Sequence, residues 1–420
     1  MTNKVTFIRL LKGWWVCLSA ALFFFYEFIQ MAMLNVIGGA MMQDLSLHAL
    51  MLGLMASSYF VANVIFLFFA GAILDRYRVK TVLLIALLIC IIGTALLAMV
   101  EQWQFALFYR FLTGIGSAFC FLSVVRLATR WFKSTQLALV VGAVVTVGMF
   151  GGVASQAPMR LLLDHLGWRG ALWVDALLGL VIAVWIAVFV EECPRNMREQ
   201  QSAQLQYVAQ KGYWYCYKKA FSQCQNWVSG FYSALMNFPI IVFGGLWGGL
   251  YLTTVHHLSL QQAPWVTQML FFGTMCGSPL FGALSDRIGN RKYPMVVGAV
   301  LTLLFIVCLW LGFVTSFLGL TIFFFMLGFF TSTQVLSYSL VAQNAASEIT
   351  AVSVSVVNIS VQGMAAVFDP LFGWIMDQSA SLSNVGTYTA LDFNRAMWLF
   401  PICIALALLF AWKVKEQPIV

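Results

Sequence analysis

The sequence predicts an all-α membrane protein in which twelve transmembrane helices form two pseudo-symmetric six-helix bundles. Three observations lead to this prediction: a very apolar composition, twelve long apolar runs, and a charged loop that occurs twice. The chain has 420 residues, of which 62% are hydrophobic and 9% are charged. Soluble globular proteins carry about 25% charged residues. We therefore expect most of the chain to be surrounded by membrane lipid.

Apolar runs of about 18 residues or more are long enough to span a bilayer as helices. Six such runs precede a polar stretch in the middle of the chain, and six follow it. This division predicts an N-terminal bundle at 1–190, a linker at 191–227 and a C-terminal bundle at 228–420. The expected spans lie near 13–41, 49–74, 81–100, 104–129, 135–158, 169–190, 228–254, 263–284, 294–314, 317–341, 350–376 and 395–413.

Lysine and arginine are unevenly distributed over the loops between these spans. If the N-terminus is inside, the loops on the outer side carry only Arg160, Arg169 and Arg395, and nearly all other basic residues lie inside. The positive-inside rule then places both termini in the cytoplasm, and we expect a bacterial inner membrane. The linker has two interpretations: residues 213–219 form an amphipathic helix on the inner membrane surface, or the linker is a partly disordered tether.

The repeated loop reads Gly, three residues, Asp-Arg and then a basic cluster, and its two aspartates are half the chain length apart. Glycine permits close helix packing, and an aspartate is favoured beside the amides of a helix N-terminus. One copy alone is equally well explained as a basic cytoplasmic turn, whereas two copies at this spacing indicate homologous halves. We predict a breakable conformational interlock formed by Gly71, Asp75, Arg76, Gly282, Asp286, Arg287 and Gly289.

These loops resemble the signature loop between helices two and three of the major facilitator superfamily and its weaker copy between helices eight and nine. The second copy is the fuller match, because Gly289 is in place, whereas Arg78 stands in the first copy where a glycine is usual. A second motif, Arg110-Phe-Leu-Thr-Gly-Ile-Gly-Ser-Ala118, resembles the helix-4 motif of this family. The resemblance implies a cavity lined by helices 1, 4, 7 and 10, and it associates Arg110 with proton coupling.

Ionisable residues inside apolar runs are functional candidates, because charge is costly in a membrane. With a rise of about 1.5 Å per residue, Glu27 and Arg110 lie at similar depths in the outer half of the bilayer. We predict that they pair, and that Glu27 takes up a proton when Arg110 binds an anionic substrate group. The alternatives are a static ion pair that fixes helix packing, and no contact between the two residues.

Two further carboxylates lie within the apolar runs. Asp369 precedes Pro370, which frees backbone carbonyl groups in a helix, and we predict a second proton site or gate there, with a structural role as the alternative. Asp175 is expected near the outer end of its helix, where it reaches water or pairs with Arg169.

Polar and aromatic residues at cavity-facing spacing are candidates for substrate contacts, although each one alone is also explained by a helix–helix hydrogen bond. No spacing of histidine and cysteine indicates a metal site, and we expect neither a metal nor a cofactor. The candidate substrate-binding residues are Tyr26, Gln30, Gln156, Asn237, Trp247, Gln334, Tyr338, Asn358 and Gln362.

Together these features predict a secondary active transporter that moves a small polar metabolite, an amino acid or an organic anion, by alternating access. The layout is similar to that of phagosomal amino-acid transporters and organic-anion carriers, which implies proton-coupled uptake. The alternative is a proton-driven exporter of a siderophore or drug-like compound, but residues 148–152 lack the Gly-Pro core typical of drug/proton antiporters. We expect a monomer without enzymatic activity whose partners are the substrate, the proton and lipid, not nucleic acid.

Overall fold

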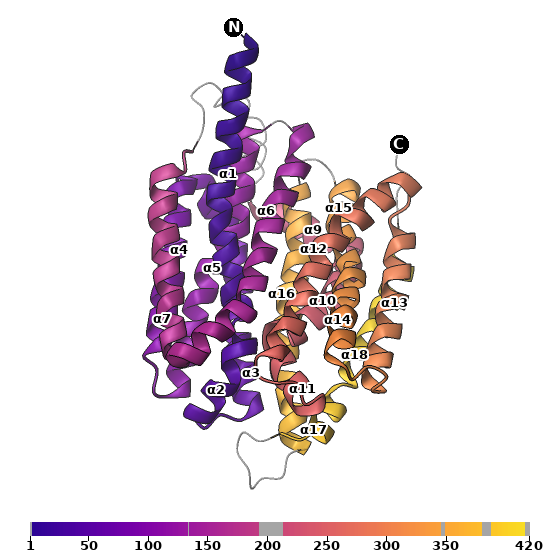
Figure 1. Ribbon diagram of the computed structural model, residues 1–420. Helices are drawn as coiled ribbons and strands as arrows, with labels where there is room; N and C mark the ends of the chain where they lie inside the picture. The colour runs from indigo at the N-terminus through magenta and orange to yellow at the C-terminus, as the bar shows by residue number, and fades with distance from the viewer. Residues whose placement is uncertain (1, 133, 193–212, 346–348, 380–387, 416–420) are drawn as a thin grey trace.

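The computed structural model describes residues 2–132, 134–192, 213–345, 349–379 and 388–415, and within these ranges its secondary structure is helical. The helices run side by side in two groups, and both ends of the chain lie at the same end of the molecule (Figure 1). We call that end the terminal face and the other end the opposite face. The predicted fold of twelve membrane helices in two bundles is confirmed.

The first bundle follows the predicted spans to within a few residues at most ends. The main differences are the extra residues at the start of α1 and the helical part of α7 that precedes Gly167, whose backbone is not helical (φ 68°). The elements are α1 (Thr2–Ala32), α2 (Leu34–Asp44), α3 (Ala49–Arg76), α4 (Val79–Ala98), α5 (Trp103–Trp131), α6 (Ser134–Ala154) and α7 (Ala157–Phe189).

The second bundle contains two interrupted helices. A π-helix interrupts its first span after Pro239, and a 3-10 turn interrupts its fourth. The elements are α10 (Cys224–Pro239), η1 (Ile240–Leu246), α11 (Gly248–Val255), α12 (Gln262–Ile288), α13 (Lys292–Trp310), α14 (Phe317–Thr331), η2 (Ser332–Val335), α15 (Leu336–Asn344), α16 (Thr350–Ser379), α17 (Ala390–Ala396) and α18 (Leu399–Lys413).

Part of the predicted linker is helical. Helix α9 (Tyr213–Ser222) lies near the terminal end of α3, where the hydroxyl of Tyr217 donates to the carbonyl of Phe68 at 3.1 Å. The ring of Phe221 also packs on that of Phe68, with centroids 5.6 Å apart. The glutamine-rich residues 193–212 of the linker lie outside the described residues.

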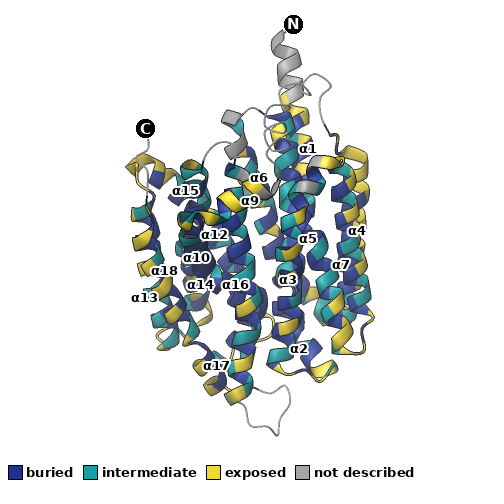
Figure 2. Cartoon of the chain, turned by 180° about the vertical axis from the view of Figure 1, so that it is seen from behind, coloured by how far each residue is buried: buried dark blue, intermediate teal, exposed yellow. Residues whose placement is uncertain are grey.

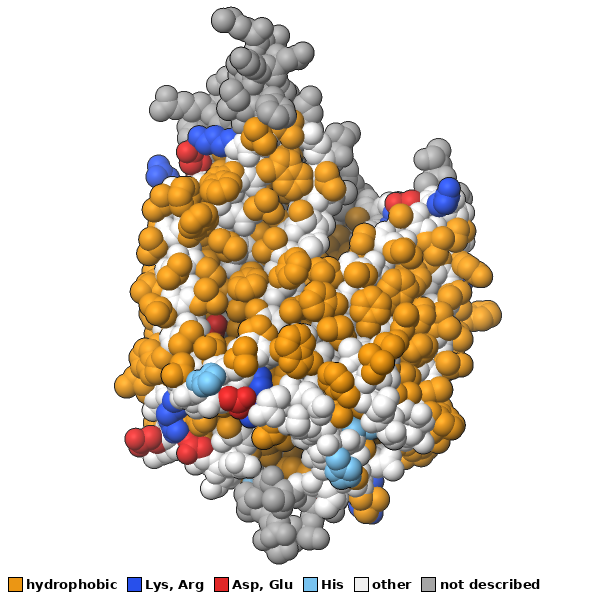
Figure 3. All heavy atoms as spheres, viewed as in Figure 1, with side chains coloured by type: hydrophobic (Ala, Val, Ile, Leu, Met, Phe, Trp, Pro, Cys, Tyr) orange, Lys and Arg blue, Asp and Glu red, His pale blue; other side chains and the backbone are white. Residues whose placement is uncertain are grey.

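The surface is that of a membrane protein. Ten stretches are long and apolar enough to cross a membrane; one of them, Leu139–Phe189, contains both α6 and α7, and α12 is not among the ten. These stretches account for eleven of the twelve predicted spans, and α12 is the twelfth. Hydrophobic side chains cover the middle of the molecule and charged ones gather toward its two ends (Figure 3), while the buried residues lie where helices face one another (Figure 2).

The two bundles meet along two helix pairs, α3 with α16 and α6 with α12. The first pair approaches closely at Gly53 and Gly373. A Cβ atom on Gly53 would lie 2.5 Å from the carbonyl oxygen of Asp369 and 2.7 Å from the Cα of Pro370, and one on Gly373 would lie 2.5 Å from the carbonyl oxygen of Ala49. Only a residue without a side chain allows the two backbones to approach in this way. Gly53 therefore permits close packing of the two bundles in the opposite-face half.

The two copies of the repeated loop have different structures. Helix α12 ends at Gly289, which is left-handed (φ 69°), whereas α3 and α4 are joined by Tyr77 and Arg78 in extended conformation. The second loop thus has the turn that a glycine favours. The first loop, with Arg78 at the corresponding position, does not.

The predicted contacts of the loop residues need correction. The side chain of Asp286 does not cap the next helix but pairs with Arg291 at 3.2 Å, and Asn290 instead accepts from the backbone N–H of Tyr293 at 2.8 Å. Nothing lies within 4 Å of a Cβ built on Gly282, so close helix packing is not its role.

The remaining loop residues do not form an inter-bundle contact among those that the structure describes. A Cβ built on Gly71 would lie 3.8 Å from the Tyr217 hydroxyl, the side chains of Arg76 and Arg287 are exposed, and that of Asp75 lies outside the described residues. An interlocking function for these loops stays a prediction.

The substitution Gly53→Ala tests the close contact between α3 and α16. The added methyl group meets backbone atoms that cannot rotate away, so we expect the protein to lose about 1–3 kcal/mol of stability, as overpacked sites do. Thermal unfolding of purified protein measures the loss. Gly142→Ala is the matched control, because nothing lies within 4 Å of a Cβ at that helical position; equal melting temperatures for the two variants would contradict the contact.

Candidate proton and substrate site

Glu27 on α1 and Arg110 on α5 are joined through Tyr59 on α3. The Tyr59 hydroxyl donates to Glu27 Oε1 at 2.5 Å, and the guanidinium carbon of Arg110 lies 4.8 Å from the centre of the Tyr59 ring. The predicted direct pair is not formed: no ion pair between Glu27 and Arg110 occurs among the described residues. The two side chains instead share an aromatic residue that sequence reasoning did not select.

Arg110 is completely buried and only partly hydrogen-bonded. Its Nη1 donates to the backbone carbonyl of Gln30 at 2.8 Å, whereas Nε and Nη2 have no hydrogen-bond partner in the described structure. A buried guanidinium that keeps N–H groups unsatisfied is costly. This arrangement leaves two donors for an anionic group.

The side chain of Gln30 belongs to the interior of the first bundle. Its Oε1 accepts from Thr94 Oγ1 at 2.8 Å, and its Nε2 donates to Asp175 on α7. Tyr26 points the same way and donates to Thr94 at 3.4 Å. Neither residue was expected to face α4 and α7.

The expectation for Asp175 was wrong. The residue is 2% exposed and does not pair with Arg169, which forms its ion pair with Asp44. Because α7 becomes helical again only after Gly167, Asp175 lies about two turns inside the helix that crosses the membrane, on the face toward α1.

Asp369 brings a carboxylate from the second bundle toward the same region. It is 1% exposed on α16, its Oδ1 has no hydrogen-bond partner among the described residues, and it interacts electrostatically with Arg110. Helix α16 continues through Pro370. The carboxylates of Asp369 and Asp175 thus interact electrostatically with Arg110, whereas Glu27 is connected to it only through Tyr59.

Gln156 forms a second polar cluster, at the opposite face. Its Nε2 donates to the Gly244 carbonyl at 3.0 Å, and its Oε1 accepts from Asn35 at 2.7 Å and from Thr267 Oγ1 at 2.7 Å. Asn35 Oδ1 in turn accepts from the backbone N–H of Gly249 at 2.8 Å. We call Asn35, Gln156 and Thr267 the opposite-face latch, because they connect the first bundle to η1, α11 and α12.

The latch residues bond the backbone where the first span of the second bundle is interrupted. In η1 the backbone N–H of Trp247 donates to Val242 at 2.7 Å, five residues back, instead of four. π-Helical turns of this kind are often functional. The side chains of Asn35 and Gln156 supply hydrogen bonds to the backbone groups of Gly249 and Gly244 on either side of this break.

Hydrogen bonds between the bundles lie in the opposite-face half of the molecule wherever the structure describes them. Besides the latch, Ser57 donates to the carbonyl of Ala366 at 2.5 Å, and Asp377 accepts from the backbone N–H groups of Ala49 and Leu50 at 3.1 and 2.9 Å. The bundles are therefore joined at the opposite face.

The other predicted substrate residues belong to the second bundle. Gln334 donates to Asn237 at 3.0 Å, and Trp247 is completely buried with its ring 5.8 Å from that of Phe372. Tyr338 is half-buried on α15. Asn358 and Gln362 are half-buried one turn apart on α16. The structure thus places Tyr26 and Gln30 inside the first bundle, Gln156 in the latch and the other six predicted residues in the second bundle, where Asn237 and Gln334 form a hydrogen-bonded pair.

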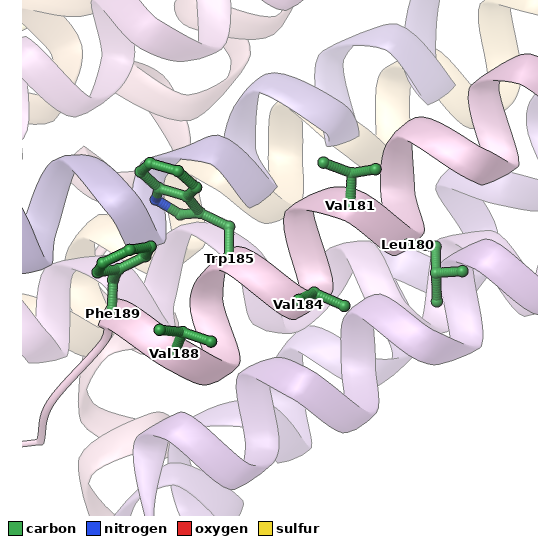
Figure 4. A pocket seen from close by; sticks show the side chains of 6 residues that line it. All are labelled: Leu180, Val181, Val184, Trp185, Val188 and Phe189. Atoms are coloured by element: carbon green, nitrogen blue, oxygen red, sulfur yellow. The ribbon is translucent and has the colours of Figure 1, made fainter.

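The groove drawn in Figure 4 is not a substrate site. It is lined by apolar residues of α7 alone, among them Val181, Trp185 and Phe189, which are exposed on the outer surface of the bundle. Lipid chains match such a surface, and polar metabolites do not.

Sequence reasoning missed Tyr59, Thr94, Asn35 and Thr267. Tyr59 follows Ser57 and Ser58 in an otherwise apolar run, and this polar interruption is a signal that singles it out. Asn35 stands in the same apolar run as Glu27 and carries the same signal. Thr94 and Thr267 carry none, because threonine is common in membrane helices, where it bonds its own backbone.

The chain belongs to the Major Facilitator Superfamily, whose family model matches residues 18–370 and 227–418. It is therefore a membrane transporter and not an enzyme. It is 25% identical over 177 residues to the hexuronate transporter of Bacillus subtilis, a match that spans 42% of each chain. It is 23% identical over 408 residues to the probable galactarate/D-glucarate transporter GudP of Escherichia coli, covering 89% of each.

Among solved structures, the chain is similar to a bacterial homolog of the human lysosomal transporter Spinster in an inward-facing and unoccupied conformation. The TM-score is 0.73 with 16% sequence identity, over 97% of this chain and 99% of the other. At this identity the likeness concerns the fold alone.

Replacing Gln156 by Leu removes the centre of the latch. Four side-chain hydrogen bonds disappear, three of them within the latch or to η1 and one to Ser155, and the Gly244 carbonyl loses its partner. We therefore expect about 2–4 kcal/mol less stabilisation of the closed opposite face. Spin labels at the exposed positions Gln43 and Leu260, in a background without native cysteines, should report longer distances. Gln261→Leu is the control, because Gln261 is exposed at the same face; an unchanged distance distribution in Gln156→Leu would argue against the latch.

A double-mutant cycle of Glu27→Gln and Tyr59→Phe tests the link between these residues. Each substitution removes one end of the same hydrogen bond, so we expect a coupling free energy of about 1.5–3 kcal/mol in thermal or denaturant unfolding. The cycle of Glu27→Gln with Tyr26→Phe is the control and should be additive, because Tyr26 bonds Thr94 instead. Additivity in both cycles is the outcome that would contradict the link.

Proposed function

We propose that this chain is a proton-coupled uptake transporter of small organic anions, of the hexuronate or aldarate class that its relatives' names specify. The observation that carries the proposal is Arg110, a completely buried arginine with two N–H groups left for an anion. A guanidinium binds a carboxylate with two parallel hydrogen bonds. The relatives that share its fold family transport sugar acids, whose carboxylates fit such a donor pair.

A substrate carboxylate competes with the carboxylates around Arg110 for its charge, and this competition provides the coupling. While no substrate is bound, the guanidinium stabilises the ionised carboxylates around it. A substrate carboxylate that binds Arg110 takes over its charge, and a carboxylate left without a partner inside the bundle is stable only after it takes up a proton. Glu27, held by the Tyr59 hydroxyl, is our candidate for this proton carrier, and Asp369 is the candidate in the second bundle.

The alternating movement follows from where the bundles are joined. With both termini in the cytoplasm, as the lysine and arginine distribution favours, the opposite face is the outside, and the latch closes that side. Opening it requires that Gln156 leave the backbone of η1 and that Asn35 leave that of α11, while the helix break at Trp247 absorbs the change in direction.

Uptake into proteoliposomes tests the function directly. We expect radiolabelled D-glucuronate or D-glucarate to accumulate when the lumen is alkaline relative to the medium, and not to accumulate without the pH gradient. Amino acids form the comparison series. Arg110→Lys should lose most of the binding, because an ammonium group cannot replace the planar pair of donors; transport of neither acid by the wild-type protein would refute the proposal.

Glu27→Gln separates transport from coupling. A glutamine cannot change its charge, so the variant should lose gradient-driven accumulation and keep the exchange of substrate across the membrane. His256→Gln is the control: burial and the neighbouring His257 lower the pKa of the His256 imidazole, which is therefore neutral at pH 7, and its replacement should leave the pH dependence above neutrality unchanged. Full accumulation by Glu27→Gln would exclude Glu27 as the proton carrier.

A further inference from the structure

Asp175 is a buried carboxylate that the predicted mechanism does not use. It lies on α7 with 2% of its surface exposed, and its Oδ1 atom has no hydrogen-bond partner in the described structure. Its Oδ2 atom accepts from the side-chain amide of Gln30. No ion pair is formed by Asp175 among the described residues, which distinguishes it from Asp44 and Asp164, since these pair with arginines at the protein surface.

The groups that face Asp175 are few. Tyr26 on α1, Cys90 on α4 and Arg110 on α5 are the titratable or charged side chains that interact with it electrostatically. Helices α2, α6 and α12 also pack on α7, but their described residues place no charged group beside this carboxylate. Arg110 is therefore the cation on which the ionised form of Asp175 depends.

Gln30 connects the two residues physically. Its backbone carbonyl accepts from Arg110 Nη1 at 2.8 Å, and its side chain donates to Asp175. Arg110 is thus connected to two carboxylates of the same bundle. Tyr59 contacts both Arg110 and Glu27, and Gln30 bonds both Arg110 and Asp175. The two carboxylates differ in one respect. Tyr59, which bonds Glu27, belongs to an apolar cluster that also contains Ile241 and Ala365 of the second bundle, whereas Asp175 lies within the first bundle.

We propose that Asp175 is a second proton-carrying residue of the transport cycle, controlled by Arg110 through Gln30. The inference rests on the proposed proton-coupled transport and adds one proton to it. When the substrate carboxylate binds the free N–H groups of Arg110, the cation no longer stabilises ionised Asp175, and the carboxylate takes up a proton from water. When the substrate leaves, Arg110 again acts on Asp175, and the proton is released on the side to which the substrate was delivered.

The slope of accumulation against the pH gradient measures the number of coupled protons. With the membrane potential held at zero, each proton carried with the anion changes the equilibrium accumulation tenfold per pH unit. We expect Asp175→Asn to lower the slope of log accumulation against the gradient by about one relative to wild type, and to keep substrate exchange. Asp175→Glu, which retains a carboxyl group, should restore the slope.

Asp164→Asn is the matched control on the same helix, because Asp164 forms a surface ion pair with Arg160 and should leave the slope unchanged. An unaltered slope in Asp175→Asn with intact exchange overturns the proposal and leaves the proposed function standing. A wild-type protein that shows no gradient-driven accumulation would instead refute the proposed function itself.

A second measurement applies if Asp175→Asn does not fold. Substrate-induced proton uptake by purified protein is followed with a pH indicator in weakly buffered solution, for wild type and Gln30→Leu. The leucine removes the one side-chain donor to the carboxylate and keeps the backbone bond to Arg110, so the pH profile of uptake should move to higher pH if Asp175 titrates during binding. An unmoved profile overturns the proposal.

Discussion

The positive charge of Arg110 is the constraint on which the rest of the structure depends. An arginine does not release its proton inside a protein, and a completely buried guanidinium therefore needs compensation from its surroundings. Here the compensation comes from four directions: the Gln30 carbonyl, the Tyr59 ring, and two carboxylates on α7 and α16. None of these forms a closed ion pair, so the charge remains available to a substrate.

This arrangement joins chemistry to the movement of the bundles. Tyr59 contacts Arg110 with its ring and Glu27 with its hydroxyl group, and it belongs to an apolar cluster that includes Ile241 of η1. Gln156 bonds Gly244 of the same π-helix, and Asn35 bonds Gly249 of α11, which follows it. The charged groups around Arg110 and the latch thus lie on two sides of one interrupted helix. Buried groups that exchange one partner for another are what a two-state transporter requires.

Prediction from the sequence was most successful for features that depend on neighbouring residues in the chain. Hydropathy located the spans, because twenty apolar residues need lipid wherever they stand. The unusual residues Glu27, Arg110 and Asp369 were recognised for the same reason. The Gly289 turn was also recognised, while the equivalent position in the first loop, Arg78, correctly signalled a different connection. Local chemistry determines each of these features.

The partners of the buried groups were not predictable in this way, because the rotation and tilt of each helix decide them. Asp175 was expected near the outer end of its span, in reach of water, but the rotation of α7 turns its side chain inside the bundle against Gln30. Tyr26 and Gln30 turn toward α4 and α7, and Gln156 reaches across to η1. The sequence by itself determined that this is a duplicated helical membrane protein with a few costly charges in its interior. Only the tertiary structure decided which of those charges meet, since hydrophobicity specifies that a helix is inserted and packing specifies which way it faces.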